Sequence, residues 1–384
     1  MAQIHWLGTG LSALPGLSSL IRSGYSVVVY NRTVEKATQA LSAVKGDYQI
    51  VEFSLGNIEQ RVKAGDVVVS MLPGDFHVPV AKLCLSLGAH FVSSSYISPE
   101  MQDLHEYALK QNLCCVNEVG LDPGIDHSMS HALVADYKNS AVFSVANQHS
   151  FISYCGGLSD TPNDFCYKFS WSPLGVLKAL MSPSVSIRDG DAYHVTKPWQ
   201  AVELYPLPMP WGAQEFEVYP NRDSLPFIDQ YQLNGGLNIK QFVRGTLRYK
   251  GWKNAWKDIF SEIDSLETTK AQSRLTELSE ELWHNFAYKE GEVDRVILTV
   301  ELKVENNSEI VWHKQYILDT LGNGQGSAMA QLVSNSVALA VEAILANDIP
   351  PGVSAAPHEP ELVERWLNRI KELSDHFVLL DHLI

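Results

Sequence analysis

The sequence predicts an α/β protein. Its first domain is a doubly wound parallel sheet, and its second is an α+β domain with a mixed sheet and a small helical subdomain. Short apolar strands alternate with amphipathic helices over roughly the first 120 residues, which is typical of a parallel sheet covered by helices. Beyond about residue 130 the strands become longer and alternate apolar with polar residues, as in mixed sheets. A chain of 384 residues also exceeds one ordinary core, so two domains are expected.

The strands of the first domain are its nearly continuous apolar segments, because a parallel sheet buries both of its faces. They are expected at residues 3–7, 26–30, 66–72, 90–93 and 113–116. Helices are expected at 14–23, 33–42, 76–87 and 99–111, with Thr33 as the N-cap of the second helix.

The second domain is expected to contain long strands at 145–154, 238–249, 293–304 and 309–320, the last two joined by a hairpin at Asn306-Asn307. Residues 251–286 are charged and helical, and residues 327–346 form a strongly apolar helix. We therefore place the first domain at 1–125 and the second at 126–352. The amphipathic tail 353–384 is a segment that can return to the first domain.

The composition excludes several classes of protein. A net charge of −15 argues against nonspecific binding to nucleic acid or to an anionic membrane. No segment reaches the roughly 18 consecutive apolar residues of a membrane span, and the N-terminus carries no basic leader. The five cysteines have neither disulfide-framework nor metal-ligand spacing, so we expect reduced thiols, no metal and a cytoplasmic location.

A glycine fingerprint, Gly8-Thr9-Gly10-Leu11-Ser12-Ala13, lies between the first strand and the first helix. In the G-x-G-x-x-A pattern the first glycine makes the turn, and the second lets backbone N–H groups approach a pyrophosphate. The third small residue allows close helix packing. In this position the pattern predicts dinucleotide binding and a Rossmann fold.

The second strand ends at Tyr30-Asn31-Arg32-Thr33, where an NAD-preferring site carries Asp or Glu for the ribose 2′-hydroxyl. That acid is absent, and Arg32 with Thr33 can hold a 2′-phosphate. NADP is therefore favoured as the cofactor, with NAD as the alternative.

Residues 116–127 end a strand and contain the turn Asp122-Pro123-Gly124. Proline fixes φ and glycine permits positive φ, so this turn is tight and rigid. Polar groups on a stiff loop after a strand indicate a site. Asp126 is interpreted as a helix cap, and His127 as a residue that caps or packs.

Other candidate site residues each have an alternative interpretation. Tyr96 lies just past a strand end, where α/β sheets bind ligands, or it is a packed aromatic. Cys155 ends another strand, or it is a small buried hydrophobe. On this acidic protein the cations that can receive an acidic substrate are Lys168, Arg222, Arg244 and Arg248. Arg244, Thr246 and Arg248 share one strand face, although a surface position is the alternative for Arg248.

Together these segments resemble the saccharopine dehydrogenase family, and within it the glutamate-forming branch. The matching motifs are Ser94-Ser95-Tyr96-Ile97-Ser98-Pro99, Asn117-Glu118 through His127, residues 153–158, 167–173, 220–224 and 244–249, and the glycine-rich turn before Ser327-Ala328-Met329-Ala330. They follow the family's order over most of the chain.

The resemblance implies an NADP-dependent oxidoreductase of lysine metabolism that interconverts saccharopine with glutamate and 2-aminoadipate 6-semialdehyde by hydride transfer to or from an imine. Saccharopine carries three carboxylates, which fits Asn221, Arg222, Arg244 and Thr246 as its binding residues.

The resemblance also places individual residues. Asp122, Tyr96 and Cys155 match positions that border the substrate and the nicotinamide, and Asp122, then Tyr96, is the favoured group for proton transfer. Residues implied to contact the cofactor beside the glycine loop are Leu72, Pro73, Ser94 and Ser95.

Two alternatives stay open. One is reductive coupling of an aldehyde and an amine, as in carboxynorspermidine synthases. The other is a noncatalytic NADP-binding metabolite sensor, against which Tyr96, Asp122 and Arg244 argue. For a chain of this size and class we expect a homodimer.

Overall fold

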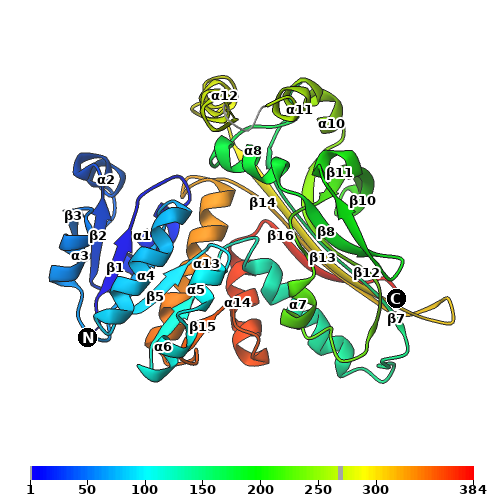
Figure 1. Cartoon of the computed structure of the whole chain (residues 1–384), viewed down its shortest axis with the longest axis horizontal. Helices are drawn as coiled ribbons and strands as arrows, with labels where there is room; N and C mark the ends of the chain where they lie inside the picture. The colour runs from blue at the N-terminus through cyan, green and yellow to red at the C-terminus, as the bar shows by residue number, and fades with distance from the viewer. Residues whose placement is uncertain (1, 267–270) are drawn as a thin grey trace. The chain divides into compact units, whose positions relative to one another are not determined.

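A computed structural model describes residues 2–266 and 271–384. The chain forms two compact units. The first combines Met1–Ser128 with Gly324–Leu373, and the second combines Met129–Asn323 with Ser374–Ile384. The C-terminal region therefore contributes to both units. Orange helix α13 lies among the blue and cyan elements of the first unit, and red strand β16 lies beside strand β14 of the second (Figure 1).

The first unit contains a seven-stranded parallel sheet in the order β15-β6-β5-β4-β1-β2-β3. The order reverses between β1 and β4, so the sheet is doubly wound, as the sequence predicts. The strands are β1 (Ile4–Leu7), β2 (Val27–Asn31), β3 (Tyr48–Glu52), β4 (Val67–Ser70), β5 (His90–Ser93), β6 (Cys114–Val116) and β15 (Gly352–Ser354).

Helices cover both faces of this sheet. Apolar side chains of α1, α13 and α14 pack on one face, and those of α3, α4, α5 and α6 pack on the other. The helices are α1 (Leu14–Arg22), α2 (Val34–Ala40), α3 (Leu55–Arg61), the 3-10 turn η1 (Gly74–Phe76), α4 (His77–Ser86), α5 (Pro99–Gln102), α6 (His105–Lys110), α13 (Ala328–Leu345) and α14 (Pro360–Glu372). α7 (Ile125–Lys138) begins in the first unit and continues into the second.

Several details of the first unit differ from the prediction. The predicted helix 99–111 is two helices, because the Leu104 N–H bonds back to the Met101 carbonyl and tightens the chain between them. Neither β3 nor α3 was predicted, since the side chains of edge strand β3 are only partly buried and give no continuous apolar segment. Thr33 is at the N-cap of α2, but its side chain makes no capping bond.

The domain boundary at residue 352 is wrong for α13 and β15. Both belong to the first unit, where β15 extends the sheet beyond β6 and α13 packs along α1. α13 is long and apolar enough to cross a membrane by length and composition, and 67% of it is buried inside the structure, as in core helices. The tail returns to the first unit only as far as α14, because β16 joins the second.

The second unit contains a mixed sheet whose main path is β10-β11-β12-β7-β13-β14-β16, with β8 and β9 attached at β12. Only the β7–β12 pair is parallel among the strand pairs described in this sheet. The strands are β7 (Gln148–Ser159), β8 (Ser184–Arg188), β9 (Asp191–Val195), β10 (Glu203–Met209), β11 (Gly212–Pro220), β12 (Asn238–Tyr249), β13 (Asp294–Asn306), β14 (Glu309–Leu321) and β16 (His376–Asp381).

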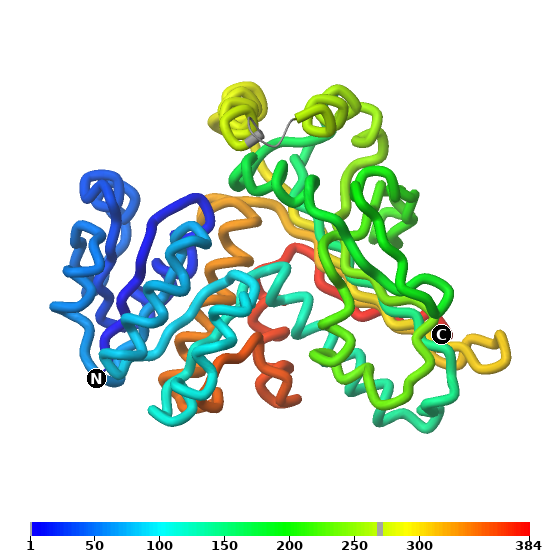
Figure 2. Tube along the Cα trace, viewed as in Figure 1, coloured from blue at the N-terminus to red at the C-terminus, as the bar shows by residue number. Residues whose placement is uncertain are grey.

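A helical subdomain accompanies this sheet, as predicted for residues 251–286, of which 267–270 lie outside the described residues. Trp199, Trp252, Trp256 and Phe260 form its aromatic core, with the Trp199 and Phe260 rings stacked at 4.8 Å. The helices of the second unit are α8 (Pro173–Met181), the 3-10 turn η2 (Pro198–Ala201), α9 (Pro226–Gln230), α10 (Trp252–Ala255), α11 (Lys257–Asp264) and α12 (Ala271–Phe286), which the tube in Figure 2 traces in green and yellow.

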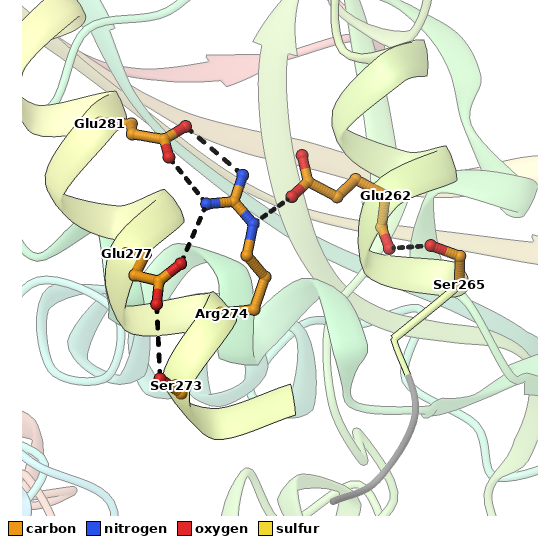
Figure 3. A network of polar contacts seen from close by, with 6 residues as sticks. All are labelled: Glu262, Ser265, Ser273, Arg274, Glu277 and Glu281. Atoms are coloured by element: carbon orange, nitrogen blue, oxygen red, sulfur yellow. Dashed lines mark hydrogen bonds and ion pairs between the residues drawn. The ribbon is translucent and has the colours of Figure 1, made fainter. Parts of the chain in front are cut away.

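Arg274 of α12 links two of these helices on the surface. Its guanidinium contacts Glu262 of α11 at 2.6 Å and Glu281 of its own helix at 2.7 Å (Figure 3). These contacts are partly or fully open to solvent, so we assign the cohesion of the subdomain to its aromatic core rather than to this ion-pair network.

Helices α1 and α13 of the first unit approach each other closely at Gly16 of α1, which the fingerprint does not include. A Cβ on Gly16 would lie 1.9 Å from the Ser334 carbonyl oxygen of α13, and the Gly16 N–H donates to Ser334 Oγ at 2.8 Å. We expect Gly16→Ala to lower the free energy of unfolding by about 1–3 kcal/mol, because the backbone of α13 cannot move aside cheaply. Denaturant unfolding measures this.

The matched control is Gly56→Ala in α3, where a Cβ would meet no atom within 4 Å in the part of the chain that the structure describes. This change should be neutral or stabilising by up to about 1 kcal/mol, since alanine favours helix. Equal effects of the two substitutions would contradict the close approach of α1 and α13.

Candidate active site

The glycine loop joins β1 to α1 at the carboxyl edge of the parallel sheet. Gly8 has φ +97°, and a Cβ there would lie 2.9 Å from the Met71 carbonyl oxygen, so the first glycine is required. Gly10 is exposed, and no atom of the described residues lies within 4 Å of the position its Cβ would take. Open space in front of backbone N–H groups at a helix start fits a pyrophosphate. Leu11 is exposed, Ser12 is half-buried, and Ala13 is buried against the core.

The residues after β2 lie beside this loop, because β1 and β2 pair in parallel up to Leu7 and Tyr30. The Thr9 N–H lies 3.4 Å from Asn31 Oδ1, and Asn31 Nδ2 donates to the Thr33 carbonyl at 2.7 Å. Asn31 therefore connects the two loops. Arg32 is exposed between them, at the position that reads the ribose 2′-substituent in this fold.

The loops after β4 and β5 meet through a histidine that the sequence reasoning missed. Leu72 and Pro73 follow β4, and Ser94 and Ser95 follow β5. His77 Nδ1 lies 2.9 Å from Ser70 Oγ, and its Nε2 lies 2.8 Å from Ser95 Oγ. Burial lowers the pKa of His77 to about 4, so the ring is neutral at pH 7. The only sequence signal was a histidine at a helix start after a strand.

The predicted turn after β6 is tightly closed. The Asp122-Pro123 peptide bond is cis, and the Gly120 N–H donates to the Pro123 carbonyl at 2.8 Å. Gly124 has φ +147°, and a Cβ there would lie 2.2 Å from the Gly120 carbonyl oxygen, so only glycine fits. The rigid-turn prediction agrees with this geometry.

This turn brings together two of the predicted proton-transfer groups. Tyr96 and Asp122 are both half-buried, and Tyr96 Oη donates to Asp122 Oδ1 at 3.3 Å. A Cβ on Gly120 would lie 3.0 Å from the Cβ of Ser94, so the turn also packs on a predicted cofactor residue. A phenol bonded to a carboxylate on this edge can accept and pass on a proton.

The residues next to the turn form a buried polar cluster. His127 is fully buried, as the packing interpretation requires, and its Nε2 lies 3.0 Å from Glu118 Oε2. Asp126 Oδ1 accepts from the Gly124 N–H at 2.6 Å. The cap prediction for Asp126 is wrong in position, because the residue is inside the first turn of α7 and its carboxylate bonds back to the preceding turn.

In the second unit, the central strands β7 and β12 carry the predicted catalytic residue Cys155 and the predicted substrate residues Arg244 and Thr246. Cys155 pairs in register with Thr246, and Ser153 with Arg244, so these four side chains share one face of the sheet. Cys155 and Thr246 are half-buried. The guanidinium of Arg244 lies 3.9 Å from the ring centre of Phe227, and the Arg244 residue is buried.

Asn221 and Arg222 lie next to Arg244, where β11 ends. The Asn221 N–H donates to the Arg244 carbonyl at 2.9 Å, and Ser224 Oγ accepts from the Arg244 N–H at 3.0 Å. Arg222 has φ +58° and is exposed, with its carbonyl accepting from the Val185 N–H. The structure therefore places Cys155, Arg244 and Thr246 on one face of β7 and β12, and its backbone hydrogen bonds place Asn221, followed by Arg222, beside Arg244 at the end of β11.

The other two predicted cations have different environments. Lys168 pairs with Glu292, so its charge is already compensated. The surface alternative for Arg248 is wrong: the residue is 5% exposed, and its guanidinium lies 4.7 Å from the ring centre of Tyr167. Tyr219 and Trp252 complete an aromatic cage around it. It has no acidic partner among the residues that the structure describes.

The first unit is a doubly wound sheet, and its open glycine loop lies where the strand order reverses, between β1 and β4. These features are those of the dinucleotide-binding domain found in the class of nicotinamide-dependent oxidoreductases. Residues 4–116 match the saccharopine dehydrogenase NADP binding domain, and residues 120–375 match the saccharopine dehydrogenase C-terminal domain. The chain belongs to the saccharopine dehydrogenase family.

Individual relatives agree with this assignment. The chain is 30% identical over 442 residues to the NADP(+)-dependent, L-glutamate-forming saccharopine dehydrogenase of Pyricularia oryzae, covering 95% of this chain and 96% of that protein. It matches the apo saccharopine dehydrogenase (L-Glu forming) structure from Saccharomyces cerevisiae with a TM-score of 0.80 and 25% identity, covering 99% and 100% of the two chains. Homospermidine synthase from Legionella pneumophila, solved with NAD, matches with a TM-score of 0.65 at 12% identity, covering 99% and 91%, which shows a shared fold alone.

The neutral His77 gives a testable pH dependence. Its folded-state pKa of about 4 lies below the ordinary 6.5, so the unfolded chain binds more protons between these two pH values. The free energy of unfolding should therefore fall as pH falls through this window, by up to about 3 kcal/mol for this residue. His77→Gln should remove that part of the slope in denaturant unfolding measured from pH 7 to pH 4.

The other histidines whose pKa burial lowers, His5, His90, His149 and His382, contribute to both proteins, so the difference in slope isolates His77. Parallel pH curves for the parent and the variant would show that His77 is not held neutral.

Proposed function

We propose that this chain is an NADP-dependent oxidoreductase that acts on the C–N bond of saccharopine, interconverting it with L-glutamate and 2-aminoadipate 6-semialdehyde. The observation that carries the proposal is the hydrogen-bonded Tyr96–Asp122 pair on the edge of the sheet that bears the glycine loop. The reaction needs both a cofactor site and a proton-transfer group, and this unit supplies both. The 30% identity to a glutamate-forming enzyme over nearly the full length supports the same conclusion.

The residues of the first unit fit the cofactor. The N–H groups of the glycine loop and the start of α1 would hold the pyrophosphate, and Arg32 with Thr33 would hold the 2′-phosphate. A bound nicotinamide would supply the hydride acceptor or donor for the carbon of the C–N bond. The neutral His77 orients the Ser95 hydroxyl without placing a positive charge beside this region.

The reaction also requires proton transfers that the chain's own residues can perform. Oxidation of the secondary amine gives an imine, water adds to the imine, and the resulting carbinolamine must lose a proton from oxygen as nitrogen gains one. Asp122 is the group we assign to these transfers, and Tyr96 passes the proton or orients the carboxylate through its hydrogen bond.

The second unit supports a substrate with several carboxylates. Saccharopine has three, and guanidinium groups bind carboxylates through two parallel hydrogen bonds. Arg244 and Arg222 are the assigned partners, with Asn221 and Thr246 as neutral donors. A homodimer and a cytoplasmic location stay predictions from the size and composition of the chain.

Reductive coupling in polyamine synthesis is the second candidate. The fold shared with homospermidine synthase is compatible with it, but a polyamine substrate is cationic, and the buried guanidinium of Arg248 would repel it. A metabolite sensor would have no need for the Tyr96–Asp122 pair.

The direct test mixes purified protein, NADP+ and saccharopine and follows the absorbance of the reduced cofactor. We expect reduction that depends on saccharopine and exceeds that with any diamine-derived amino acid. If the cofactor reacted only with polyamine precursors, the protein would instead be assigned the coupling reaction. Cofactor binding without any turnover would support the sensor hypothesis.

A second prediction concerns the choice of cofactor. Arg32→Ala should raise the KM for NADP by about 10-fold or more, since a hydrogen bond to a charged group contributes about 1.5–3 kcal/mol. The KM for NAD should change little, because NAD lacks the 2′-phosphate. Arg22→Ala, an exposed arginine at the other end of α1, is the control and should affect neither cofactor. Equal effects of Arg32→Ala on both cofactors would remove the 2′-phosphate assignment.

A further inference from the structure

The two proton-transfer groups belong to different loops. Tyr96 follows β5, whereas Asp122 follows β6, 26 residues later in the chain. Their hydrogen bond of 3.3 Å therefore depends on whatever keeps the two loops together. One residue, Glu118, is linked to both loops: it bonds directly to the Tyr96 loop and reaches the Asp122 turn through His127.

On the side of Tyr96, Glu118 holds the backbone on either side of the tyrosine. Its N–H donates to the Ser95 carbonyl at 3.0 Å, and its Oε1 accepts from the Ile97 N–H at 3.0 Å. These are the residues immediately before and after Tyr96. Displacement of Glu118 would therefore release the tyrosine loop.

On the side of Asp122, the contact passes through His127. Glu118 Oε2 lies 3.0 Å from His127 Nε2, and His127 Nδ1 lies 3.7 Å from Asp126 Oδ2. Asp126 Oδ1 in turn accepts from the N–H of Gly124, which closes the turn that carries Asp122. A continuous set of polar contacts thus runs from Ser95 to Gly124.

This arrangement lowers the stability of the fold, so stability does not explain its presence. Glu118 is 5% exposed and His127 is fully buried, so their polar groups have lost most of their hydration. Glu118 also has φ +56°, a backbone conformation that is unfavourable for a residue with a side chain. Residues in such conformations cluster at functional sites, where their surroundings hold them.

We propose that Glu118, acting through His127, is a positioning residue that holds Tyr96 and Asp122 at hydrogen-bond distance for proton transfer. The proposal rests on the function proposed above, because it takes these two side chains as the proton-transfer groups. The role of Glu118 is to set their geometry, not to exchange the proton.

The same unit provides a matched control. Asp66 is a buried carboxylate that pairs with the buried His5 at 3.1 Å and accepts backbone N–H groups from Gln3 and Lys63, both at 2.8 Å. It has the same kinds of contact as Glu118 but precedes β4, at the amino edge of the sheet. Asp66→Asn should therefore affect stability without affecting catalysis.

The test compares Glu118→Gln with Asp66→Asn. We expect both to lower the melting temperature, whereas only Glu118→Gln lowers kcat for saccharopine oxidation, by about 10- to 100-fold, as small misplacements of reacting groups do. The KM for saccharopine and the Kd for NADPH, measured by fluorescence, should change less than about 3-fold, because those contacts remain. An equal loss of kcat in Asp66→Asn would show that Glu118 acts only through stability.

Coupling to Tyr96 gives a second readout. If Glu118 positions Tyr96, then Tyr96→Phe should lower kcat less in the Glu118→Gln background than in the parent, since the hydrogen bond is already disturbed. Losses of kcat that multiply across the two substitutions would overturn the proposal.

A crystal structure of Glu118→Gln separates this inference from the proposed function. We expect the Tyr96 Oη to Asp122 Oδ1 distance to exceed the 3.3 Å of the parent, and an unchanged distance would overturn the positioning role. The distance can be measured whether or not the protein turns over saccharopine. If the parent protein were inactive on saccharopine, the proposed function would be refuted, but the distance would still decide whether Glu118 positions Tyr96 and Asp122. Should Glu118→Gln fail to fold, His127→Gln allows the same measurements, because glutamine keeps an N–H donor for Glu118 but loses the second ring nitrogen.

Discussion

The parallel pairing of β1 with both β2 and β4 is the constraint on which the candidate site depends. Leu7 pairs with Tyr30 on one side and with Ser70 on the other, so the three following loops begin at the same level of the sheet. Neighbouring strands lie about 4.8 Å apart, which brings the glycine loop, Arg32 and the His77 contacts to one edge. Backbone hydrogen bonds in the strands hold this geometry, so the glycine loop itself can stay open in front of Gly10.

The core beneath this edge is completed by a distant part of the chain. α13 packs along α1 at Gly16, and β15 extends the sheet next to β6. The chain then returns to the second unit as β16, which pairs with β14. Neither unit is built from one continuous stretch of sequence, so the loops that carry Tyr96 and Asp122 rest on a core that the C-terminal region helps to form.

Prediction from sequence was most successful where a residue type restricts its own backbone. Gly8 and the turn Asp122-Pro123-Gly124 are examples, because positive φ and close backbone approach need glycine. Prediction failed where a side chain contacts a residue that lies far away in the sequence. His77 bonds to Ser95 across 18 positions, and Arg248 is buried by Tyr167, which comes from a separate segment. A strand pattern shows that Arg248 shares a face with Arg244, but it does not show what covers that face.

The sequence by itself determined the local features: the strand and helix periods, the glycine loop, the rigid turn and the absence of an acid after β2. These follow from backbone sterics and from burial patterns, which act over a few residues. Only the tertiary structure decided that α13 belongs with α1, that His127 pairs with Glu118, and that Tyr96 meets Asp122. The physical reason is that a buried polar group takes its partner from whatever packing places within about 3 Å, whatever the separation along the chain.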